Sequence, residues 1–485
     1  MSSVLVHRER TDAIEMLPIG EWRSTLLERA RGGMRPLTLF GRRDGDRALL
    51  TVVHQDRSRL VVSRTSVDIA HGYHELTSDL PALHCFEREL HEQLGLRIAG
   101  HPWLKPIRYE GLDQRAMDAY PFYRVDGKEV HEVAVGPIHA GVIEPGSFRF
   151  MCFGEHVLHL EIHLGYQHRG VEHRLLERDP RTLAPWIETI AGDTSVAHCW
   201  AYCAALEELL DVTIDPEIEL SRAVALELER IAMHLAGLSG LAADVGFLPG
   251  ASTYGRLRTT AINTSMRLCG SRFGRSAVRP GGGGMSLDPE RWELVRANVE
   301  LLRRDGAIID DCFLSARTVH HRLAGVGVLA RDAATQIGAV GMIARSAGIA
   351  IDARVRGLYE QHPVTVCTEP SGDCWSRARL RIEEIRASLD WLDRVLAEPR
   401  SWTPRRASLP ALPPSQLAIA AVEGWRGEVL HCIETDAAGS VAHYKAQDPS
   451  LRNWMALALA VRGNEISDFP ICNKSFDLSY CGSDL

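Results

Sequence analysis

The side chains best suited to chemistry are concentrated between residues 136 and 207. This stretch carries histidine, glutamate and arginine at close spacing between turns marked by glycine, and no other segment is as dense in such groups. Side chains of these types give and take protons in general acid–base catalysis. Glycine–proline pairs at 136–137 and 145–146 bracket a predicted hairpin, which places His139 and Glu144 near its tip.

A second polar cluster follows this hairpin. The run 156–163 alternates loosely and predicts a strand, and glycines then interrupt the chain around His168, Arg169 and Glu172. The histidines between 156 and 173 do not have the spacing of a known zinc motif, and no paired cysteines assist them. An independent zinc site is therefore disfavoured.

Composition describes an ordinary globular chain. Of its 485 residues, 45% are hydrophobic and 24% charged, with a net charge of -8, so nucleic-acid binding has little support. The N-terminus has no signal-peptide pattern, and no apolar run is long enough to cross a bilayer. The eleven cysteines include no CxxC pair, which favours reduced thiols in a cytoplasmic protein.

The elements that position these residues are predicted to form two domains. In the first, residues 1–35 are expected to form an amphipathic helix, residues 36–63 a set of strands, and residues 86–94 a helix with one apolar face. We predict an α/β domain over residues 1–115 and a linker over 116–130.

The large remainder, residues 131–485, is predicted to be mainly helical with short strands. Apolar residues at helical spacing mark a long helix over 219–243, beside a polar ridge of Glu227, Arg230 and His234. We interpret that ridge as a surface or interhelical ion pair. The glycines at 281–284 lack the lysine and the βαβ frame of a phosphate loop.

Motifs in the first domain resemble a known family. The segment CFERELHEQLGLRIAGHPWLKPIRY is similar to the signature of the C-type subunit in the peripheral arm of complex I. This resemblance implies the small α/β domain already predicted.

Residues 131–485 resemble the large-subunit family shared by [NiFe] hydrogenases and complex I, in particular the D subunit of complex I and the formate hydrogenlyase branch. The matching pieces occur in the family's order: GPIHAGVIEPGSFRF, HLGYQHRGVE, AYCAALE, ELERIAMHL, RPGG, GDCWSRARLRIEE, KAQDPSLRNW and RGNEISDFP. The resemblance implies an α+β fold, mainly helical, with short antiparallel sheets.

In hydrogenases of this family, four cysteine thiolates hold nickel and iron. Soft thiolates are what such a centre requires. By the register of the motifs, the four ligand positions here are Ala191, Thr194, Ser479 and Gly482, none of which has a thiol, and Cys481 is out of register. We also expect no C-terminal extension of the kind removed after metal insertion. The sequence thus predicts that this chain lacks a Ni–Fe centre.

In complex I, quinone occupies the equivalent place, between a histidine and a tyrosine. The histidine matches His139, but the tyrosine position is Gly192. Glu188 and Asp193 lie nearby in sequence and are hypothesised to give or take the proton in its place. We therefore name His139, Glu188 and Asp193 as candidate catalytic residues.

The resemblance also implies surroundings for this site. Glu144, His168, Arg169, Glu172, Asp373 and Arg377 are expected to line or brace a cleft, or to contact a partner. The alternative is that several of them satisfy one another in a buried network, which we favour for Asp373 and Arg377. An iron–sulfur subunit with a [4Fe-4S] cluster and membrane-arm subunits are the expected partners.

Three functions follow from these observations. The first is a peripheral subunit, at the inner face of the cell membrane, that takes part in electron transfer from a partner's iron–sulfur cluster to quinone or another acceptor. The second is a non-catalytic structural or coupling subunit of the same complex. The third, an active formate hydrogenlyase-type [NiFe] subunit, is contradicted by the missing thiolates. Any oxidoreductase activity is expected only within a complex, and this chain alone is expected to bind no cofactor.

Overall fold

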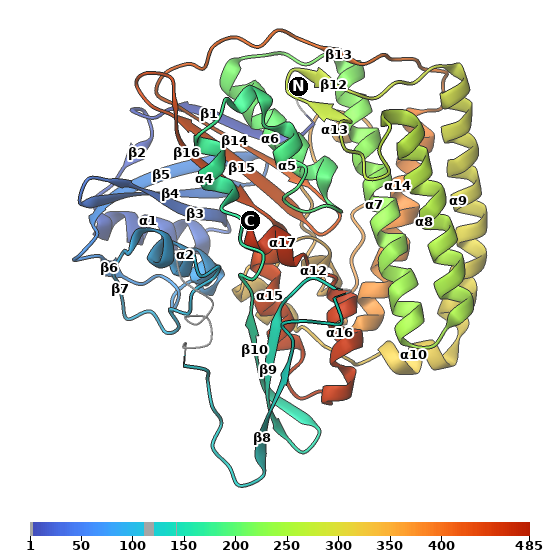
Figure 1. Cartoon of the computed structure of the whole chain (residues 1–485), viewed down its shortest axis with the longest axis horizontal. Coiled ribbons are helices and arrows are strands. Elements are labelled where there is room, and N and C mark those ends of the chain that lie inside the picture. The colour runs from blue at the N-terminus through green and yellow to red at the C-terminus, as the bar shows by residue number, and fades with distance from the viewer. Residues whose placement is uncertain (1–2, 111–120, 142) are drawn as a thin grey trace.

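Sheets and helices occupy different parts of the molecule. The computed structural model describes residues 3–110, 121–141 and 143–485. Short sheets gather on one side and at the bottom in Figure 1, and long helices stand together on the other side. The predicted α+β class, with short antiparallel sheets, is confirmed.

The N-terminal region is a small sheet covered by helices. Its elements are β2 (Glu15–Met16), α1 (Ile19–Arg31), β3 (Arg35–Asp44), β4 (Arg47–Asp56), β5 (Arg59–Asp68), β6 (Tyr73–His74), α2 (His84–Leu94) and β7 (Ile98–Ala99). The strand order is β2-β5-β4-β3. Helix α2 packs Phe86 and Leu90 against Leu50 of β4. Gly41 permits this approach, because a Cβ there would lie 2.9 Å from Leu50 and Leu90.

A second sheet joins the two ends of the chain. It consists of β1 (Leu5–Arg10), β14 (Gln416–Glu423), β15 (Glu428–Thr435) and β16 (Val441–Gln447), in that order and fully antiparallel. The prediction of a helix over residues 1–35 is therefore wrong for its first part. Residues 5–10 become a strand because β14, far along the chain, supplies their hydrogen-bonding partner, and no local pattern reveals such a partner.

The two sheets share a core. Leu37 and Phe40 of β3 cluster with Leu417 and Ile419 of β14. Ion pairs also cross between the sheets, with Arg35 2.9 Å from Glu428. The predicted domain 1–115 is thus packed directly on the predicted domain 131–485, and the boundary between them stays a prediction. Part of the predicted linker, residues 111–120, lies outside the described residues.

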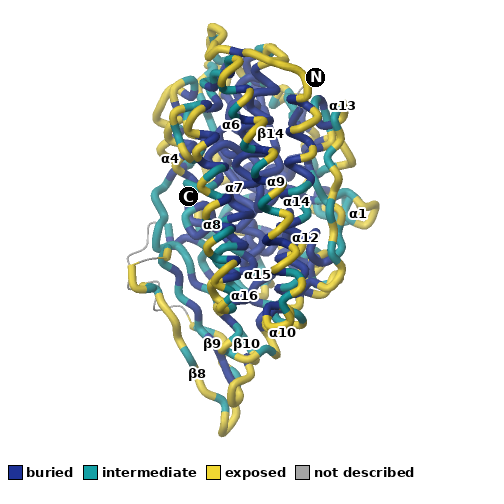
Figure 2. Tube along the Cα trace, turned by 90° about the vertical axis from the view of Figure 1, so that its right-hand side faces the viewer, coloured by how far each residue is buried: buried dark blue, intermediate teal, exposed yellow. Residues whose placement is uncertain are grey.

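A third sheet carries the predicted hairpin. Strands β8 (Val130–Val135), β9 (Ser147–Phe153) and β10 (His156–His163) pair antiparallel in the order β10-β9-β8. The sheet projects from the body, and its outer strand β8 is largely exposed (Figures 1 and 2). The hairpin between β8 and β9 is confirmed, with a bridge from His139 to Ile143 across its loop.

Helices make up most of the remaining chain. The helical bundle comprises α7 (Pro216–Asp244), α8 (Leu248–Cys269), α9 (Pro289–Ser315) and α14 (Cys374–Val395). Between this bundle and the sheets lies α6 (Ser195–Leu210), which is buried along nearly its whole length. The shorter elements are α4 (Val171–Leu176), α5 (Ala184–Ile187), β11 (Val278–Arg279), β12 (Gly282–Gly283), α10 (Arg317–Leu323), α11 (Arg331–Gln336), α12 (Gly341–Ser346), α13 (Leu358–Gln361) and β13 (Arg405–Arg406).

The C-terminal residues are buried. Helices α15 (Pro449–Ala460), α16 (Phe469–Phe476) and α17 (Tyr480–Asp484) bring Leu485 to the middle of the molecule, as Figure 1 shows. Across the described ranges, no helix combines the length and the apolar character needed to cross a bilayer.

Candidate functional site

The structure brings the predicted ligand positions together through Arg426, which lies in the turn between β14 and β15. Its guanidinium makes two bonds of 2.7 Å to the carboxylate of Asp193. It also donates to the Thr194 hydroxyl at 3.2 Å and to the carbonyl of Asp477. One buried side chain thus joins the loop before α6 to the segment before α17. We call residues 188–194, 424–427 and 477–485 the central junction.

Arg169 makes a second connection across the central junction. Its guanidinium donates to the carbonyls of Thr189 at 2.8 Å and Ile190 at 3.1 Å on one side, and to that of Cys481 at 3.3 Å on the other. Its backbone N–H donates to the Leu485 carbonyl at 2.8 Å. The two stretches that carry the predicted ligand positions therefore face each other.

The donor set at these four positions does not fit a thiolate-held nickel–iron pair. Ala191 presents a buried methyl group. The Thr194 hydroxyl bonds to Asp193 and Arg426. The Ser479 hydroxyl caps α17 by accepting the Gly482 N–H at 2.9 Å, and a Cβ on Gly482 would lie 2.7 Å from Asp448. Hydroxyl oxygens already engaged in local hydrogen bonds do not replace soft thiolates.

Cys481 supplies a thiol beside these positions. Its sulfur lies 3.5 Å from the Ser479 hydroxyl. Burial and the neighbouring Glu144 carboxylate raise the pKa of Cys481 to about 12. The group is therefore a protonated thiol at neutral pH in this arrangement. Glu144 also accepts the Tyr480 N–H at 3.3 Å, so the tip of the hairpin touches the central junction.

His139 is held inside its own hairpin. Its Nε2 lies 2.8 Å from the Gly146 carbonyl oxygen, and its half-buried ring lies 5.9 Å from that of Phe148. Within the described chain, no hydrogen bond or ion pair joins His139 directly to Glu188 or Asp193.

The two candidate acids have different surroundings. Glu188 is buried and points to the glycine-rich turn, where its carboxylate accepts the Ser276 N–H at 2.6 Å and pairs with Arg279 at 2.7 Å. Burial alone would raise the pKa of Asp193, but the Arg426 guanidinium outweighs it and the pKa is lowered. Asp193 is therefore ionised at neutral pH and has no proton to donate, and its pairing with Arg426 also makes it a weak proton acceptor.

Two predicted lining residues lie next to the central junction or near it. Nδ1 of His168 lies 2.7 Å from the Asp484 carbonyl oxygen. Glu172 lies farther out, where its carboxylate accepts the Ala446 N–H at 2.9 Å and pairs with Lys445 at 3.0 Å. Glu172 thus joins α4 to β16.

Asp373 and Arg377 brace the start of α14. Asp373 caps this helix by accepting the Ser376 N–H at 2.8 Å. The buried guanidinium of Arg377 donates to the carbonyls of Gly372 and Gly327 and to the Ser475 hydroxyl. Their polar atoms are engaged within the chain, in line with the network interpretation.

Sequence reasoning missed a buried chain of hydrogen bonds beside Gly482. Asp448 lies 3.0 Å from His198 Nε2, His198 Nδ1 lies 3.1 Å from His431 Nε2, and His431 bonds to the Tyr444 hydroxyl. These side chains come from α6, β15, β16 and the N-cap of α15. No spacing along the sequence predicts the chain, because the fold alone brings the four elements together.

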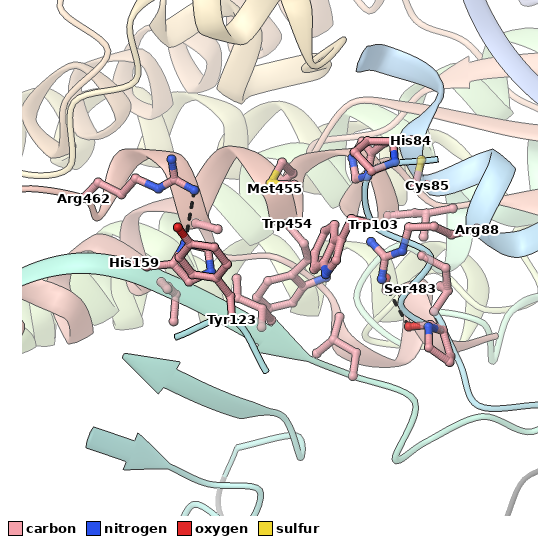
Figure 3. Close-up of a pocket in the computed structure, with 18 residues that line it drawn as sticks. His84, Cys85, Arg88, Trp103, Tyr123, His159, Trp454, Met455, Arg462 and Ser483 are labelled. Atoms are coloured by element: carbon pink, nitrogen blue, oxygen red, sulfur yellow. Dashed lines mark hydrogen bonds between the residues drawn. The ribbon is translucent and has the colours of Figure 1, made fainter. Parts of the chain in front are cut away.

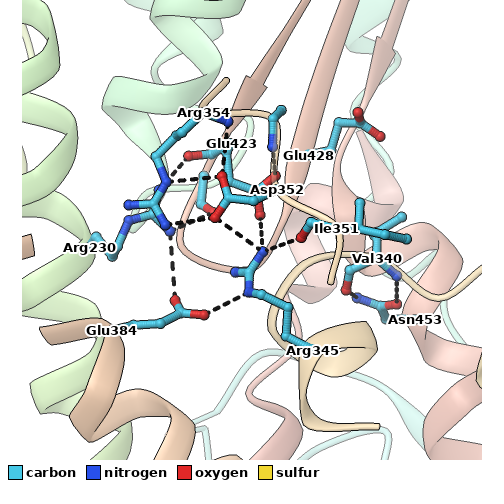
Figure 4. Close-up of polar contacts among 12 residues, drawn as sticks. Arg230, Val340, Arg345, Ile351, Asp352, Arg354, Glu384, Glu423, Glu428 and Asn453 are labelled. Atoms are coloured by element: carbon cyan, nitrogen blue, oxygen red, sulfur yellow. Dashed lines mark hydrogen bonds and ion pairs between the residues drawn. The ribbon is translucent and has the colours of Figure 1, made fainter. Parts of the chain in front are cut away.

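The polar ridge on α7 belongs to a larger buried network, and Figure 4 shows the part of it around Arg230 and Arg345. Glu227 pairs with Arg230 at 3.2 Å and with Arg354 at 3.1 Å. Arg345 bridges Glu384 of α14 at 2.8 Å and Glu423 of β14 at 2.6 Å. The predicted interhelical pairing is present, but it is fully buried and also joins the bundle to the second sheet through Glu423 of β14. Arg230 also donates to the Gly424 carbonyl at 3.1 Å, which connects this network to the central junction.

Comparisons with known proteins agree with this architecture. Residues 244–405 match the family described as "Respiratory-chain NADH dehydrogenase, 49 Kd subunit". The chain is similar to formate hydrogenlyase subunit 5 of Escherichia coli (strain K12), with 27% identity across 85% of this chain and 77% of that protein. It is also similar to NADH-quinone oxidoreductase subunit 4 of Thermus thermophilus, with 27% identity across 76% of this chain and 98% of that protein.

A solved structure shares the fold. A chain of the membrane-bound sulfane sulfur reductase, an archaeal respiratory membrane complex, superposes with a TM-score of 0.69 at 22% identity, covering 75% of this chain and all of that one. Together with the motif order and the central junction, these matches confirm the recognition made from the sequence. The chain is related to the large-subunit family shared by complex I and energy-converting hydrogenases.

Proposed function

We propose that this chain is a peripheral subunit of a membrane-associated respiratory complex of the complex I and hydrogenase type. In that complex it takes part in electron transfer from a partner's [4Fe-4S] cluster to quinone or another acceptor, without a Ni–Fe centre of its own. The names of its relatives support the type of complex. The iron–sulfur partner, the membrane-arm partners and the position at the inner membrane face are parts of the same proposal.

The observation that carries this proposal is the chemistry of the central junction. The two ligand-bearing segments are still joined, by Arg169 and Arg426, while the four ligand positions offer no thiolate. A family member with this arrangement is suited to hold an acceptor that receives electrons from a partner's cluster, not to activate hydrogen. Metal analysis of the purified complex is expected to find no nickel in stoichiometric amount, and stoichiometric nickel would contradict the proposal.

His139 is the side chain of this chain that we assign to the acceptor. A quinone takes up two electrons and two protons when it is reduced. The His139 ring is half-buried on the hairpin, and its bond to the Gly146 carbonyl fixes the ring's orientation. Released from that carbonyl, an imidazole N–H can donate to an acceptor oxygen.

The test is quinone reduction by the intact complex carrying His139→Ala. We expect the rate to fall by roughly 100-fold, the usual effect of losing a positioned proton donor. His173→Ala is the matched control, because His173 is exposed on α4 and pairs only with Glu177 in the described chain. It should leave the rate unchanged.

A structural or coupling subunit is the second candidate. It is favoured by the engagement of Glu188 with Arg279 and of Asp193 with Arg426, and by glycine at position 192. Unchanged turnover in His139→Ala, with no binding of quinone-site inhibitors to the complex, would establish this candidate in place of the first.

A further inference from the structure

A cavity of about 310 Å³ lies where the N-terminal region meets the rest of the chain (Figure 3). Helix α2 and the segment 101–107 form one side, and strand β10 and helix α15 form the other. Its walls are mainly aromatic and aliphatic, including Trp103, Leu160, Trp454 and Met455. This size and lining are typical of sites that take small molecules.

Two buried polar side chains on the cavity wall have no hydrogen-bonding partner among the described residues. His84 is 8% exposed and Trp454 is 5% exposed. Neither ring nitrogen of His84 is bonded, and neither is the indole N–H of Trp454. Burial deprives such groups of their hydrogen bonds to water, so native proteins rarely leave them unsatisfied without a reason.

His84 and Trp454 offer hydrogen bonds of known type. Burial and the positive charge of Arg88 lower the pKa of His84 to about 3, so its imidazole is neutral and has one N–H donor and one acceptor nitrogen. Trp454 can only donate. A ligand that satisfies both therefore needs an acceptor oxygen.

The charges around the cavity select against cations. The guanidinium of Arg88 lies 4.1 Å from the centre of the Trp103 ring and donates to the carbonyls of Lys105 and Pro106. Arg462 lies on the lining opposite, 3.3 Å from His159 (Figure 3). No aspartate or glutamate is among the described residues that line the cavity. Cationic ligands are repelled, and flat uncharged rings can lie against the indole faces.

We propose that this cavity binds a flat, uncharged aromatic molecule that carries a carbonyl oxygen, with Trp454 and His84 as its hydrogen-bonding partners. The inference goes beyond the proposed function, because the cavity lies outside the central junction and involves none of its residues except Ser483. A ligand here would contact both parts of the chain and hold them together.

Three probes with the same ring system test this proposal on the purified full chain. They are 9-fluorenone, which has a carbonyl, fluorene, which lacks it, and 9-aminofluorene, which is cationic at neutral pH. Equilibrium dialysis is expected to show fluorenone binding about tenfold more tightly than fluorene, as one or two net hydrogen bonds allow. 9-Aminofluorene should bind more weakly than both. Equal binding of fluorenone and fluorene, or preference for the amine, would overturn the proposal.

Two variants locate the binding site. Trp454→Phe and His84→Phe keep an aromatic ring and remove the polar nitrogens, so each should lower fluorenone binding toward that of fluorene and leave fluorene binding nearly unchanged. Trp402→Phe is the matched control, because Trp402 is a buried tryptophan with an unbonded N–H away from this cavity.

The two variants also guard against misfolding. If one of them fails to fold by circular dichroism, the other decides the outcome. If Trp454→Phe and His84→Phe both fold and still bind fluorenone more tightly than fluorene, the molecule binds elsewhere. Loss of this preference in Trp402→Phe as well would lead to the same conclusion.

Discussion

The guanidinium of Arg426 holds a carboxylate, a hydroxyl and a carbonyl from two segments that are far apart in sequence. Its side chain is nearly buried, and the Asp193 partner is about one-third exposed. A buried cation with this many partners fixes a geometry, even where its net contribution to stability is small. At the residue scale, the central junction is therefore an arginine-centred site.

Arg426→Met should destabilise the protein by about 1–3 kcal/mol, because it leaves the partly exposed Asp193 carboxylate and the Asp477 carbonyl without their donor. Urea unfolding at pH 7 measures this loss. Arg304→Met is the control, since Arg304 forms an exposed pair with Asp305, and such pairs contribute about 0–1 kcal/mol. Equal effects of the two substitutions would contradict the structural role of Arg426.

Glu229 of α7 should make stability depend on pH. Its carboxyl accepts the Val196 N–H at 2.7 Å, and burial, with Asp193 nearby, raises its pKa to about 8. In the unfolded chain a glutamate titrates near pH 4.3, so the folded state holds the extra proton between these values. This contribution is fully present below about pH 4.3 and is lost as pH rises through 8.

Glu229→Gln should remove that dependence. The variant is expected to match the parent near pH 5 and to be more stable by a few kcal/mol, on the order of 3–5, at pH 9. Denaturant unfolding across this range provides the measurement. Glu300→Gln, at an exposed position of α9, is the control and should leave the pH profile as it is. If the unfolding free energy of Glu229→Gln depends on pH in the same way as that of the parent, the pKa of Glu229 is not raised.

At this scale, the sequence could predict contacts between residues that are close together along the chain. His139 and Glu144 lie on one hairpin, so turn residues alone located them near its tip. Arg426, His198 and Asp448 come from separate elements, and no periodicity links them. Motif register did indicate that positions near 191 and 479 belong together, and the structure joins their segments.

At the scale of elements, α7 packs closely against side chains of the neighbouring helix α14. A Cβ on Gly237 would lie 2.8 Å from the guanidinium carbon of Arg381, which reaches across from α14. A Cβ on Gly306 of α9 would have no other atom within 4 Å. Both glycines lie inside helices and neither has a positive φ, so the surroundings alone distinguish them.

This contrast predicts opposite effects for one substitution. Gly306→Ala should stabilise the protein by about 0.5–1 kcal/mol through helix propensity. Gly237→Ala should destabilise it by about 1–3 kcal/mol, because Arg381 must move and overpacking has that cost. Thermal unfolding of the two variants gives the comparison. A stabilising Gly237→Ala would mean that Arg381 is free to shift.

Elements with strong local patterns were predictable, and those defined by distant partners were not. The helix over 219–243 and the strand 156–163 appear as α7 and β10. Residues 5–10 were misassigned, because their strand exists only as the partner of β14. Propensity carries little weight when a sheet supplies the missing hydrogen bonds.

At the scale of the whole molecule, the N-terminal region is joined to the rest by buried charge as well as by a shared core. Glu89 of α2 pairs with Lys445 of β16 at 2.7 Å and with Arg108. These two cations outweigh the effect of burial and lower the pKa of Glu89 to about 2. The carboxylate therefore stays ionised at every physiological pH.

Glu89→Gln should cost about 3–5 kcal/mol at pH 7, because it leaves two buried cations short of a partner. The difference should shrink as pH falls from 4.3 through 2, where the parent carboxylate becomes protonated. Unfolding followed by both fluorescence and circular dichroism gives the measurement. Glu28→Gln on the exposed side of α1 is the control and should change stability by less than about 0.5 kcal/mol.

The pairing of β1 with β14 affects folding during synthesis. Leu5 of β1 pairs with Ala421 of β14, so β1 has no neighbouring strand until Ala421 has been synthesised. At about 5–20 residues per second, a ribosome needs roughly 20–80 s to deliver that partner. During this interval the hydrogen-bonding edge of β1 in the nascent chain lacks its native partner. Folding of the protein in cells should therefore depend on chaperones that shield this strand.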